Sequence, residues 1–256
     1  MQKHVLAVMA HQDDEVAFLS RLARERLYGN RVSCVYLTNG EAYGVPAAVR
    51  NNESVKALKS INIATTNIFF FGDEFNIPDG GLPKYIDSAY SALMDWASKQ
   101  TIDRIYTLAF EGGHHDHDAS HLISAALAVQ LKLTHQTWQL PFYHGYQSPK
   151  KLFRVLNPLS NKHWPCQRHL TLSEALSYIW TIRFYRSQWK SWVGLFPEYA
   201  FQRLIIRQET LAPLCFKSIA ERPHPGPLLY ERLFGYSFKK FKSETQAFRE
   251  RFLKIR

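Results

Sequence analysis

The chain has few cysteines and no long hydrophobic run. Its three cysteines, Cys34, Cys166 and Cys215, are odd in number and widely spaced, which favours free thiols in a reducing compartment over a disulfide framework. The longest apolar runs, such as residues 67–71, are far shorter than the roughly 20 residues of a membrane span. The N-terminus has no basic region followed by a long apolar stretch. We therefore expect a cytoplasmic protein without a membrane-inserted segment.

Internal repeats, low-complexity tracts and long linkers are also absent from the sequence. With 256 residues, of which 46% are hydrophobic and 21% charged, the chain can bury a full core. We predict a single domain over residues 1–256. It divides into an α/β core at 1–147 and a mainly helical C-terminal extension at 148–256, packed on that core.

The charge balance is strongly positive. The formal net charge is +10, and the basic excess is concentrated after residue 148. Such a surface attracts phosphate groups, whether in nucleic acid, anionic lipid or a phosphorylated sugar carrier. Charge alone does not choose among these partners.

Apolar runs alternate with helical spacings along the first half of the chain. The runs that predict strands are residues 5–9, 32–37, 67–71 and 103–110, with one more at 138–143. Helices are predicted after Glu15, around Arg50, from Pro83 to Ala97 and at 119–133. This alternation predicts an α/β fold with a mostly parallel sheet flanked by helices. In the extension we expect a helix after the capping box Thr171–Glu174, another from Pro197 to Ile206, and a last one over 244–255.

Two polar clusters follow directly on predicted strands. The first is Ala10-His11-Gln12-Asp13-Asp14-Glu15, and the second is Gly113-His114-His115-Asp116-His117. The carboxyl ends of strands in an open α/β sheet can meet at one crevice, whatever their separation in sequence. Bringing His11, Asp14 and His117 together gives two imidazoles and one carboxylate. That is a catalytic zinc set with one position left for water or substrate.

The neighbouring residues supply the other parts of a hydrolytic site. Zinc lowers the pKa of its water from about 15.7 to about 7, and Asp13 is placed to take the water's proton as general base. His114 is placed to stabilise an oxyanion or to protonate a leaving amine, with Asp116 fixing its tautomer. Arg50 supplies a fixed positive group if its helix overhangs the crevice. These parts describe metal-assisted hydrolysis of an amide or ester.

The residues resemble the signatures of the PIG-L-like zinc deacetylases, the family of the N-acetylglucosaminyl-phosphatidylinositol de-N-acetylase. The first cluster resembles the A-H-P-D-D-E motif of that family, and the second resembles G-H-x-D-H. Between them, in the family's order, lie Thr38-Asn39-Gly40-Glu41, Arg50-x-x-Glu53 and Asp79-Gly80. Gln12 replaces the usual proline, which we expect to loosen its loop slightly. Asn39 replaces the usual aspartate, so a charge role of that turn does not carry over.

The resemblance, which covers about residues 4–145, implies a Rossmann-like fold and a metal-dependent N-deacetylase. It implies zinc, or another divalent ion such as Fe²⁺, on His11, Asp14 and His117, with Asp13 as base and His114, Asp116 and Arg50 acting on the transition state. The implied substrate is an N-acetylated amino sugar of the GlcNAc type on a glycoconjugate. Aryl and alkyl amides are the alternative substrates. We expect Arg50 and Asp79 to contact the substrate. The place of His144 after a strand predicts that it lines the sugar pocket.

Other interpretations of the same residues stay open. A His114-x-Asp116 pair with a distant histidine is also the form of the iron facial triad of oxygenases, although many of those enzymes are all-β. The stretches 183–186 and 189–192 interleave cations with aromatics. This pattern is typical of nucleic-acid binding modules, but it also fits a surface that touches an anionic membrane, or a helix whose aromatics pack inward while its cations stay in water. We expect His115 to face outward. The remaining histidines are expected at the surface or hydrogen-bonded in the core, namely His4, His121, His135, His163, His169 and His224.

Overall fold

A six-stranded sheet forms the centre of the molecule. The computed structural model describes residues 1–256 except 43, 149–151, 160–163 and 255–256, so that His163 lies outside the described residues. The strand order is β10-β5-β4-β1-β2-β3. All of the pairings are parallel except that of β10 with β5. The strands of this sheet are β1 (His4–Met9), β2 (Arg31–Tyr36), β3 (Ile68–Phe70), β4 (Arg104–Leu108), β5 (Thr137–Leu140) and β10 (Ala212–Pro213).

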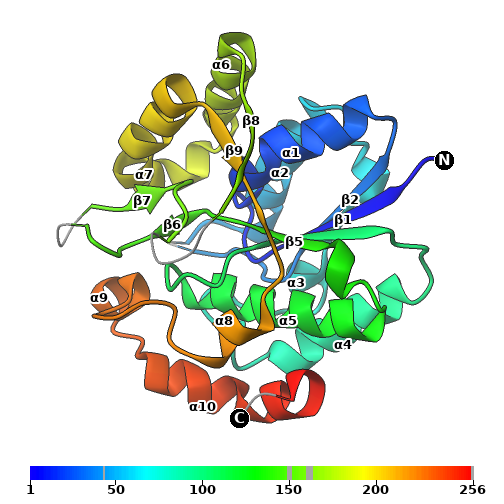
Figure 1. Cartoon of the computed structure of the whole chain (residues 1–256), viewed down its shortest axis with the longest axis vertical. Helices are drawn as coiled ribbons and strands as arrows, with labels where there is room; N and C mark the ends of the chain where they lie inside the picture. Colours follow the sequence, from blue (N-terminus) through cyan, green and yellow to red (C-terminus); the bar gives the residue numbers. More distant parts are fainter. Residues whose placement is uncertain (43, 149–151, 160–163, 255–256) are drawn as a thin grey trace.

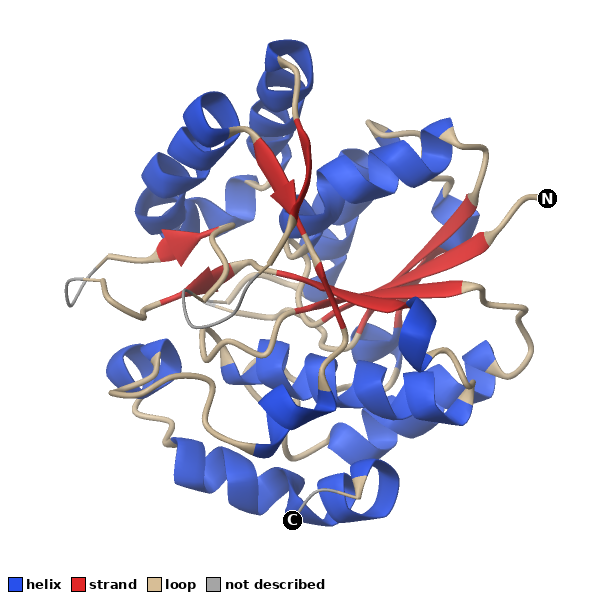
Figure 2. Ribbon diagram, in the orientation of Figure 1, coloured by secondary structure: helices blue, strands red, loops and turns tan. Residues whose placement is uncertain are grey.

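Helices cover both faces of the sheet (Figures 1 and 2). The helices of the first half are α1 (Glu15–Leu27), α2 (Ala47–Lys59), α3 (Phe71–Glu74), α4 (Ile86–Ala97) and α5 (His115–Gln130). Those of the second half are α6 (Leu172–Thr181), α7 (Trp189–Phe201), α8 (Phe216–Ala220), α9 (Leu229–Phe234) and α10 (Phe238–Phe248). The α/β architecture with a mostly parallel sheet is therefore as predicted.

Strand β1 divides the hydrophobic core into two layers. Its alternate side chains point to opposite faces, as the period of two in a strand requires. Leu6 and Val8 pack with α4 and α5, whereas Val5 and Ala7 pack with α1 and α2. All six residues of β1 are buried. A strand covered on both faces reads as a continuous apolar run, which is why the sequence revealed it.

The C-terminal half does more than pack on the core. Its strand β10 adds an antiparallel edge to the sheet beside β5. Two small sheets pair β6 (Tyr143–His144) with β7 (Arg154–Val155), and β8 (Cys166–His169) with β9 (Gln208–Thr210). The predicted capping box at Thr171 and Glu174 is present at the start of α6. Among the helices of the described residues, none combines the length and hydropathy needed to cross a bilayer.

Two helix boundaries in this half differ from the prediction. The helix expected to begin at Pro197 begins at Trp189 and contains Pro197 in its interior, and a π-helical segment, Gln202–Ile206, follows it. Proline is common in the first turn of a helix, but neighbouring packing also tolerates it further inside. Here Trp192 and Leu195 pack α7 on the core before Pro197 is reached. The last helix begins at Phe238, where Ser237 caps it, and not at Glu244.

Candidate metal centre and active site

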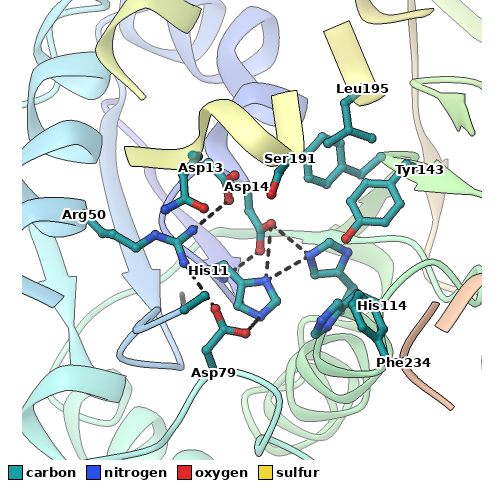
Figure 3. Close-up of a pocket in the computed structure, with 14 residues that line it drawn as sticks. His11, Asp13, Asp14, Arg50, Asp79, His114, Tyr143, Ser191, Leu195 and Phe234 are labelled. Atoms are coloured by element: carbon teal, nitrogen blue, oxygen red, sulfur yellow. Dashed lines mark hydrogen bonds and ion pairs between the residues drawn. The ribbon is translucent and has the colours of Figure 1, made fainter. Parts of the chain in front are cut away.

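The two polar clusters meet in one cavity at the carboxyl ends of β1 and β4 (Figure 3). The cavity has a volume of about 150 Å³. Both halves of the chain contribute to its wall. The lining residues are His11, Asp13, Asp14, Ala42, Arg50, Asp79, His114, His117, Phe142, Tyr143, Gln188, Ser191, Leu195 and Phe234.

His117 meets His11 and Asp14 although it lies more than a hundred residues further along the chain. The Nδ1 atom of His11 lies 3.2 Å from Nε2 of His117. Asp14 Oδ1 lies 2.9 Å from His117 Nε2 and 3.8 Å from His11 Nδ1. The other carboxylate oxygen of Asp14 accepts the backbone N–H groups of Ala10 and His11, both at 2.8 Å. The backbone thus fixes one oxygen of Asp14 and directs the other at the imidazoles.

This donor set fits a divalent cation. In a tetrahedral zinc site with bonds of about 2.0–2.1 Å, ligand atoms lie about 3.3 Å apart. The three separations found here, 2.9, 3.2 and 3.8 Å, scatter around that value. All three side chains are buried, and a buried carboxylate facing two ring nitrogens is costly without a cation among them. Those imidazoles hold the pKa of Asp14 well below its usual value, against the opposing effect of burial.

Among the residues that the structure describes, two other groups of side chains lie close enough to hold an ion, but each includes a carboxylate with other partners. They are His11 with Asp79 and His114, and His114 with His115 and Asp116. Asp79 pairs with Arg50, whose Nη1 lies 3.1 Å from Oδ2. Asp116 is bound by backbone amides. The set predicted from the sequence is therefore the best candidate for a metal site.

The carboxylate of Asp116 acts on His11 and not, as the sequence suggested, on His114. Asp116 Oδ2 accepts the Nε2–H of His11 at 3.0 Å. The backbone N–H groups of Gly80 and Leu82 donate to Oδ2 and Oδ1 at 2.6 and 3.1 Å. This arrangement keeps the proton of His11 on Nε2 and leaves Nδ1 free as a ligand atom. The reason for the difference is that Asp116 lies in the first turn of α5 and points across the cleft to β1.

Asp13 occupies a strained backbone position beside the candidate metal ligands. Its φ of 142° is rarely adopted by residues other than glycine. The side chain of Glu15, which is fully buried, accepts the Asp13 N–H through Oε2 at 3.0 Å. Burial raises the pKa of Asp13 to about 7, with Arg50 opposing the shift. A carboxylate with a pKa near neutrality suits a general base. Glu15, the first residue of α1, thus holds Asp13 in place.

Arg50 connects Asp13 to the loop that carries Asp79. Its Nη2 donates to the carbonyl of Gln12 at 2.8 Å and lies 3.4 Å from Asp13 Oδ1. Its Nη1 donates to the Gly40 carbonyl and to Asp79 Oδ2. Arg50 and Asp79 therefore both face the cavity, and they also hold each other in position. Their predicted contact with substrate stays a prediction.

The two departures from the family motifs have structural roles. The Gln12 amide donates to the carbonyls of Thr38 and Asn39 and, at 2.7 Å, to Asn51 Oδ1. Gln12 thus ties its loop down, contrary to the loosening that we expected. Asn39 Oδ1 accepts the backbone N–H of Asp79 at 3.1 Å. An amide keeps this acceptor while adding no further negative charge to the acidic site.

His114 is the N-cap of α5 and is oriented through its own backbone. The N–H of Asp116 donates to His114 Nδ1 at 3.1 Å, so the ring proton of the neutral form lies on Nε2. Burial, followed by the neighbouring histidines, holds the pKa of His114 well below its usual value. His114 is therefore a neutral N–H donor on the cavity wall.

His115 does not face outward as predicted. It is buried, its Nε2–H donates to the Gly80 carbonyl at 2.9 Å, and its ring stacks on Tyr236 with centroids 4.1 Å apart. This residue joins the loop that carries Asp79 to the C-terminal half. The packing of Tyr236, which is remote in sequence, decides its position.

His144 does not line the cavity, contrary to the prediction, whereas the preceding residue, Tyr143, does. His144 Nε2–H donates to the Asn157 carbonyl at 2.9 Å, while its Nδ1 accepts the N–H of Tyr146 at 3.1 Å. Both ring nitrogens thus order the surrounding loop, and we do not carry His144 forward as a substrate ligand. Successive residues of a strand face opposite ways, so within β6 Tyr143 and His144 point to different sides. Burial raises the pKa of Tyr143 well above its usual value, which keeps its hydroxyl a donor.

The C-terminal half supplies cavity residues that the sequence did not reveal, namely Gln188, Ser191, Leu195 and Phe234. Ser187, beside this wall, is fastened to α2, because its N–H and Oγ–H donate to the two carboxylate oxygens of Glu53 at 2.8 and 2.6 Å. Glu53 is the second residue of the Arg50-x-x-Glu53 motif. Nothing in the spacing of residues 187–234 identifies them as neighbours of a metal site.

The remaining histidines that the structure describes lie as expected. His4 and His121 are buried and hydrogen-bonded to Ser33 Oγ and to the Leu108 carbonyl. His135 and His169 are exposed. His224 is buried, with Nδ1 bonded to the carbonyl of Pro225.

Comparison with known proteins gives one family match. A family model described as PIG-L, GlcNAc-PI de-N-acetylase, matches residues 6–128. The match includes every residue of the candidate metal set together with Asp13, Arg50, Asp79 and His114. Among proteins of curated function, none matches the chain.

Several solved structures share the fold. The zinc-inhibited form of the teicoplanin deacetylase Orf2 has 15% identity and a TM-score of 0.58, over 82% of this chain and 97% of that one. The A40926 pseudoaglycone deacetylase Dbv21 has 13% identity and a TM-score of 0.59, over 83% and 97%. The N,N'-diacetylchitobiose deacetylase of Pyrococcus horikoshii has 16% identity and a TM-score of 0.54, over 82% and 84%. At these identities the similarity is one of fold.

Proposed function

This chain belongs to the PIG-L family of metal-dependent N-deacetylases, and from that premise we propose that it removes the acetyl group from an N-acetylated amino sugar of a glycoconjugate. The observation that carries the proposal is the meeting of His11, Asp14 and His117 beside Asp13 in one cavity. Two imidazoles and a carboxylate leave a coordination position open, as catalytic metal sites do. A structural site would close that position with a fourth protein ligand.

We propose that His11, Asp14 and His117 hold zinc, with Fe²⁺ as the alternative ion. The bound ion would act as a Lewis acid and bring the pKa of water toward neutrality. The ligand atoms are two nitrogens and one oxygen, a set that suits either ion. One deacetylase of similar fold was solved in a zinc-inhibited form, so the fold alone does not identify zinc as the activating ion. The activating ion of this chain is therefore to be measured.

Asp13 is the proposed general base. It lies next to the ligand Asp14, lines the cavity, and has a pKa of about 7. A positioned base of this kind contributes typically 10²–10⁴-fold to a rate. Arg50, bonded to the carbonyl of Gln12 and 3.4 Å from Asp13 Oδ1, keeps the carboxylate turned into the cavity.

His114 is the proposed donor to the reacting acetyl group. Its Nδ1 accepts a backbone N–H, so Nε2–H is the group that is free to face the carbonyl oxygen or the leaving nitrogen. A neutral donor placed where negative charge develops stabilises the transition state. Tyr143, whose ring centroid lies 5.1 Å from that of His117, offers a second hydroxyl donor at the same wall.

The proposed substrate class is supported by the polar and aromatic character of the cavity. Arg50 and Asp79 offer charged hydrogen-bonding groups to sugar hydroxyls, and Phe142, Tyr143 and Phe234 offer ring faces and edges. Related folds belong to deacetylases of N,N'-diacetylchitobiose and of the A40926 pseudoaglycone. We extend the proposal to a cytoplasmic location, since Cys34 and Cys215 are free thiols.

Acetate release tests the proposal. The metal-loaded protein is incubated with N-acetylglucosamine in free, nucleotide-linked, lipid-linked and aryl-linked forms, and with a simple aryl acetamide as control. We expect release from at least one sugar conjugate, loss of release with a chelator, and its return when zinc or Fe²⁺ is added. Release from the aryl acetamide alone would replace the sugar substrate with a non-sugar amide. Release that survives full metal removal would overturn the metal-dependent mechanism.

A further inference from the structure

The outer faces of helices α6 and α7 carry large apolar side chains that no part of the described chain covers. They recur at helical spacing and form two stripes, Leu172, Leu176 and Trp180 on α6, and Trp189, Val193 and Phe196 on α7. Trp180, Trp189 and Val193 are 64%, 60% and 67% exposed. In Figure 1 both helices lie at the outside of the molecule, beyond α1 and the β6–β7 hairpin.

These helices are apolar on their inner faces as well. Trp192, Leu195 and Tyr199 bury the inner side of α7, and Ala175 and Tyr178 bury that of α6. A surface helix normally alternates an apolar stripe with a polar one. Clustered apolar side chains on the outward face mark an interaction site. The two stripes therefore need a partner that the single chain does not provide.

Cations surround the stripes. Arg183 and Arg186, in the segment that joins α6 to α7, and Lys190, in the first turn of α7, are all exposed. The guanidinium of Arg183 lies 4.5 Å from the ring centroid of Trp180. Over residues 172–201 the acidic side chains are Glu174 and Glu198, and Glu174 is paired with Arg168. The partner must therefore be both apolar and negatively charged.

We propose that the stripes of α6 and α7 dock on an anionic lipid bilayer without crossing it. Tryptophan prefers the level of the lipid headgroups, aliphatic side chains reach just below it, and arginine and lysine pair with lipid phosphates. A second copy of the chain fits less well, because each copy carries a net charge of +10 and the same basic segment. Single-stranded nucleic acid would stack on aromatics, but Tyr185 and Trp192 are buried and half of the stripe residues are aliphatic.

Docking would leave α7 between the bilayer and the cavity, so that the two are separated by the width of one helix. Helix α7 supplies Ser191 and Leu195 to the cavity wall from another of its faces. Phe234 of α9 lines the same cavity and is half exposed, so it lies at the mouth. The acetylated sugar would then be one carried on a lipid. This use of the surface rests on the proposed function, whereas the docking itself does not.

Sedimentation with vesicles tests the docking. The full chain is mixed with vesicles of phosphatidylcholine alone and of phosphatidylcholine with phosphatidylglycerol, at low and high salt. We expect binding to the anionic vesicles that exceeds binding to the neutral ones by roughly tenfold or more and weakens with salt. Equal binding to both, or no binding to either, would overturn the proposal.

Two matched pairs of variants locate the contact. Trp189→Ser with Val193→Ser should lower vesicle binding roughly tenfold, through the lost apolar area. The control is Tyr28→Ser with Val129→Ser, an aromatic directly after α1 and a valine at the end of α5 that are 60% and 42% exposed. In the second pair, the test variant combines Arg183→Gln with Arg186→Gln and removes two exposed charges beside the stripes. Its control combines Lys59→Gln with Lys99→Gln and removes two exposed charges elsewhere. Each control should bind as the parent does, and an equal loss in a control would show that the stripes are not the contact.

The other occupants have their own signatures. A dimer in sedimentation equilibrium that Trp189→Ser with Val193→Ser dissociates would assign the stripes to a second copy. Binding to a single-stranded oligonucleotide that the same variant abolishes, without vesicle binding, would assign them to nucleic acid. Vesicle binding is measured without turnover, so its failure leaves the deacetylase proposal standing. A failure of acetate release would likewise leave the docking intact.

Discussion

His11 uses its two ring nitrogens for different purposes, and this division organises the site at the scale of single residues. Nε2 binds Asp116, itself held by the backbone of the loop after Asp79, and Nδ1 faces Asp14 and His117. Because the orientation of the His11 ring is already fixed, an ion that binds there does not have to order this side chain. The neighbouring Asp13 is fixed just as firmly, by Glu15 and Arg50. Ligand and base are thus adjacent in sequence but depend on separate supports.

Substitution of Asp13 should separate catalysis from metal binding. Asp13→Asn keeps the shape of the side chain and removes its basicity, so turnover should fall by roughly 10²–10⁴-fold while metal content stays near the parent level. His117→Ala should lose the metal as well as turnover. Elemental analysis beside acetate release measures both. Retained turnover in Asp13→Asn would remove Asp13 as the base, and full metal occupancy in His117→Ala would remove His117 as a ligand.

His144 should contribute a pH dependence to folding stability. Burial lowers its pKa to about 4, whereas the unfolded chain has a histidine pKa of about 6.5. As the pH falls below about 6.5, the unfolded state takes up a proton that the folded state refuses, so the free energy of unfolding falls between about 6.5 and 4. The full effect is about 3 kcal/mol.

Urea unfolding at several pH values checks this prediction. The His144→Gln variant should lose that part of the decline in stability between pH 6.5 and 4, while His135→Gln, at an exposed histidine, should decline as the parent does. Parallel curves for His144→Gln and the parent would contradict the role given to His144.

Helix α2 connects the site to the C-terminal half at the scale of elements. Arg50 and Glu53 are three residues apart and so share a face of the helix. Arg50 reaches the base and Asp79, and Glu53 accepts two hydrogen bonds from Ser187. Ser187 directly precedes Gln188 and α7, which form one wall of the cavity. One helix face therefore positions both the catalytic groups and the opposite wall.

A double-mutant cycle should detect this connection. We expect Glu53→Gln and Ser187→Ala to couple by about 1–3 kcal/mol in the free energy of unfolding, because buried hydrogen bonds to a charged group are strong. The pair of Arg251 with Asp87, 2.9 Å apart but more than half exposed, serves as control and should couple by about 0–1 kcal/mol. Equal coupling in the two cycles would show that Glu53 does not anchor the C-terminal half.

At the scale of the whole molecule, the candidate metal ligands come from two neighbouring segments of the fold, one after β1 and one after β4. His11 and Asp14 follow β1, while His117 lies in α5 after β4. An ion shared by these segments binds the folded state and not the unfolded chain. The C-terminal half closes the same cavity through α7 and α9. Under the proposed metal assignment, metal binding and global stability are therefore linked.

Zinc should accordingly raise the melting temperature. At a free ion concentration one hundred times Kd the gain is about 2.7 kcal/mol. Each kcal/mol corresponds to about 2–4 °C for a chain of this size. Differential scanning fluorimetry with zinc and with a chelator measures the shift. Asp13→Asn should keep it and His117→Ala should lose it, so an undiminished shift in His117→Ala would place the stabilising ion elsewhere.

The first half of the chain could be predicted from its sequence because its signals are local. Buried parallel strands appear as apolar runs, and the polar residues that end them fall at the carboxyl edge of the sheet by geometry alone. The α/β fold and the meeting of His11, Asp14 and His117 follow from that. The contacts of Asp116 could not be predicted in the same way. They depend on how the first turn of α5 faces His11 and the loop that contains Gly80.

The second half was decided by tertiary packing. Its strand β10 and its cavity residues Ser191, Leu195 and Phe234 come from segments without a catalytic pattern. Contacts with the first half help to fix their positions, among them the pairing of β10 with β5, the hydrogen bonds of Ser187 to Glu53 and the stacking of Tyr236 on His115. The sequence by itself therefore determined which groups we propose for the chemistry, since those lie next to strands that local hydrophobicity defines. Only the tertiary structure decided what encloses them, since that depends on contacts between residues more than a hundred positions apart.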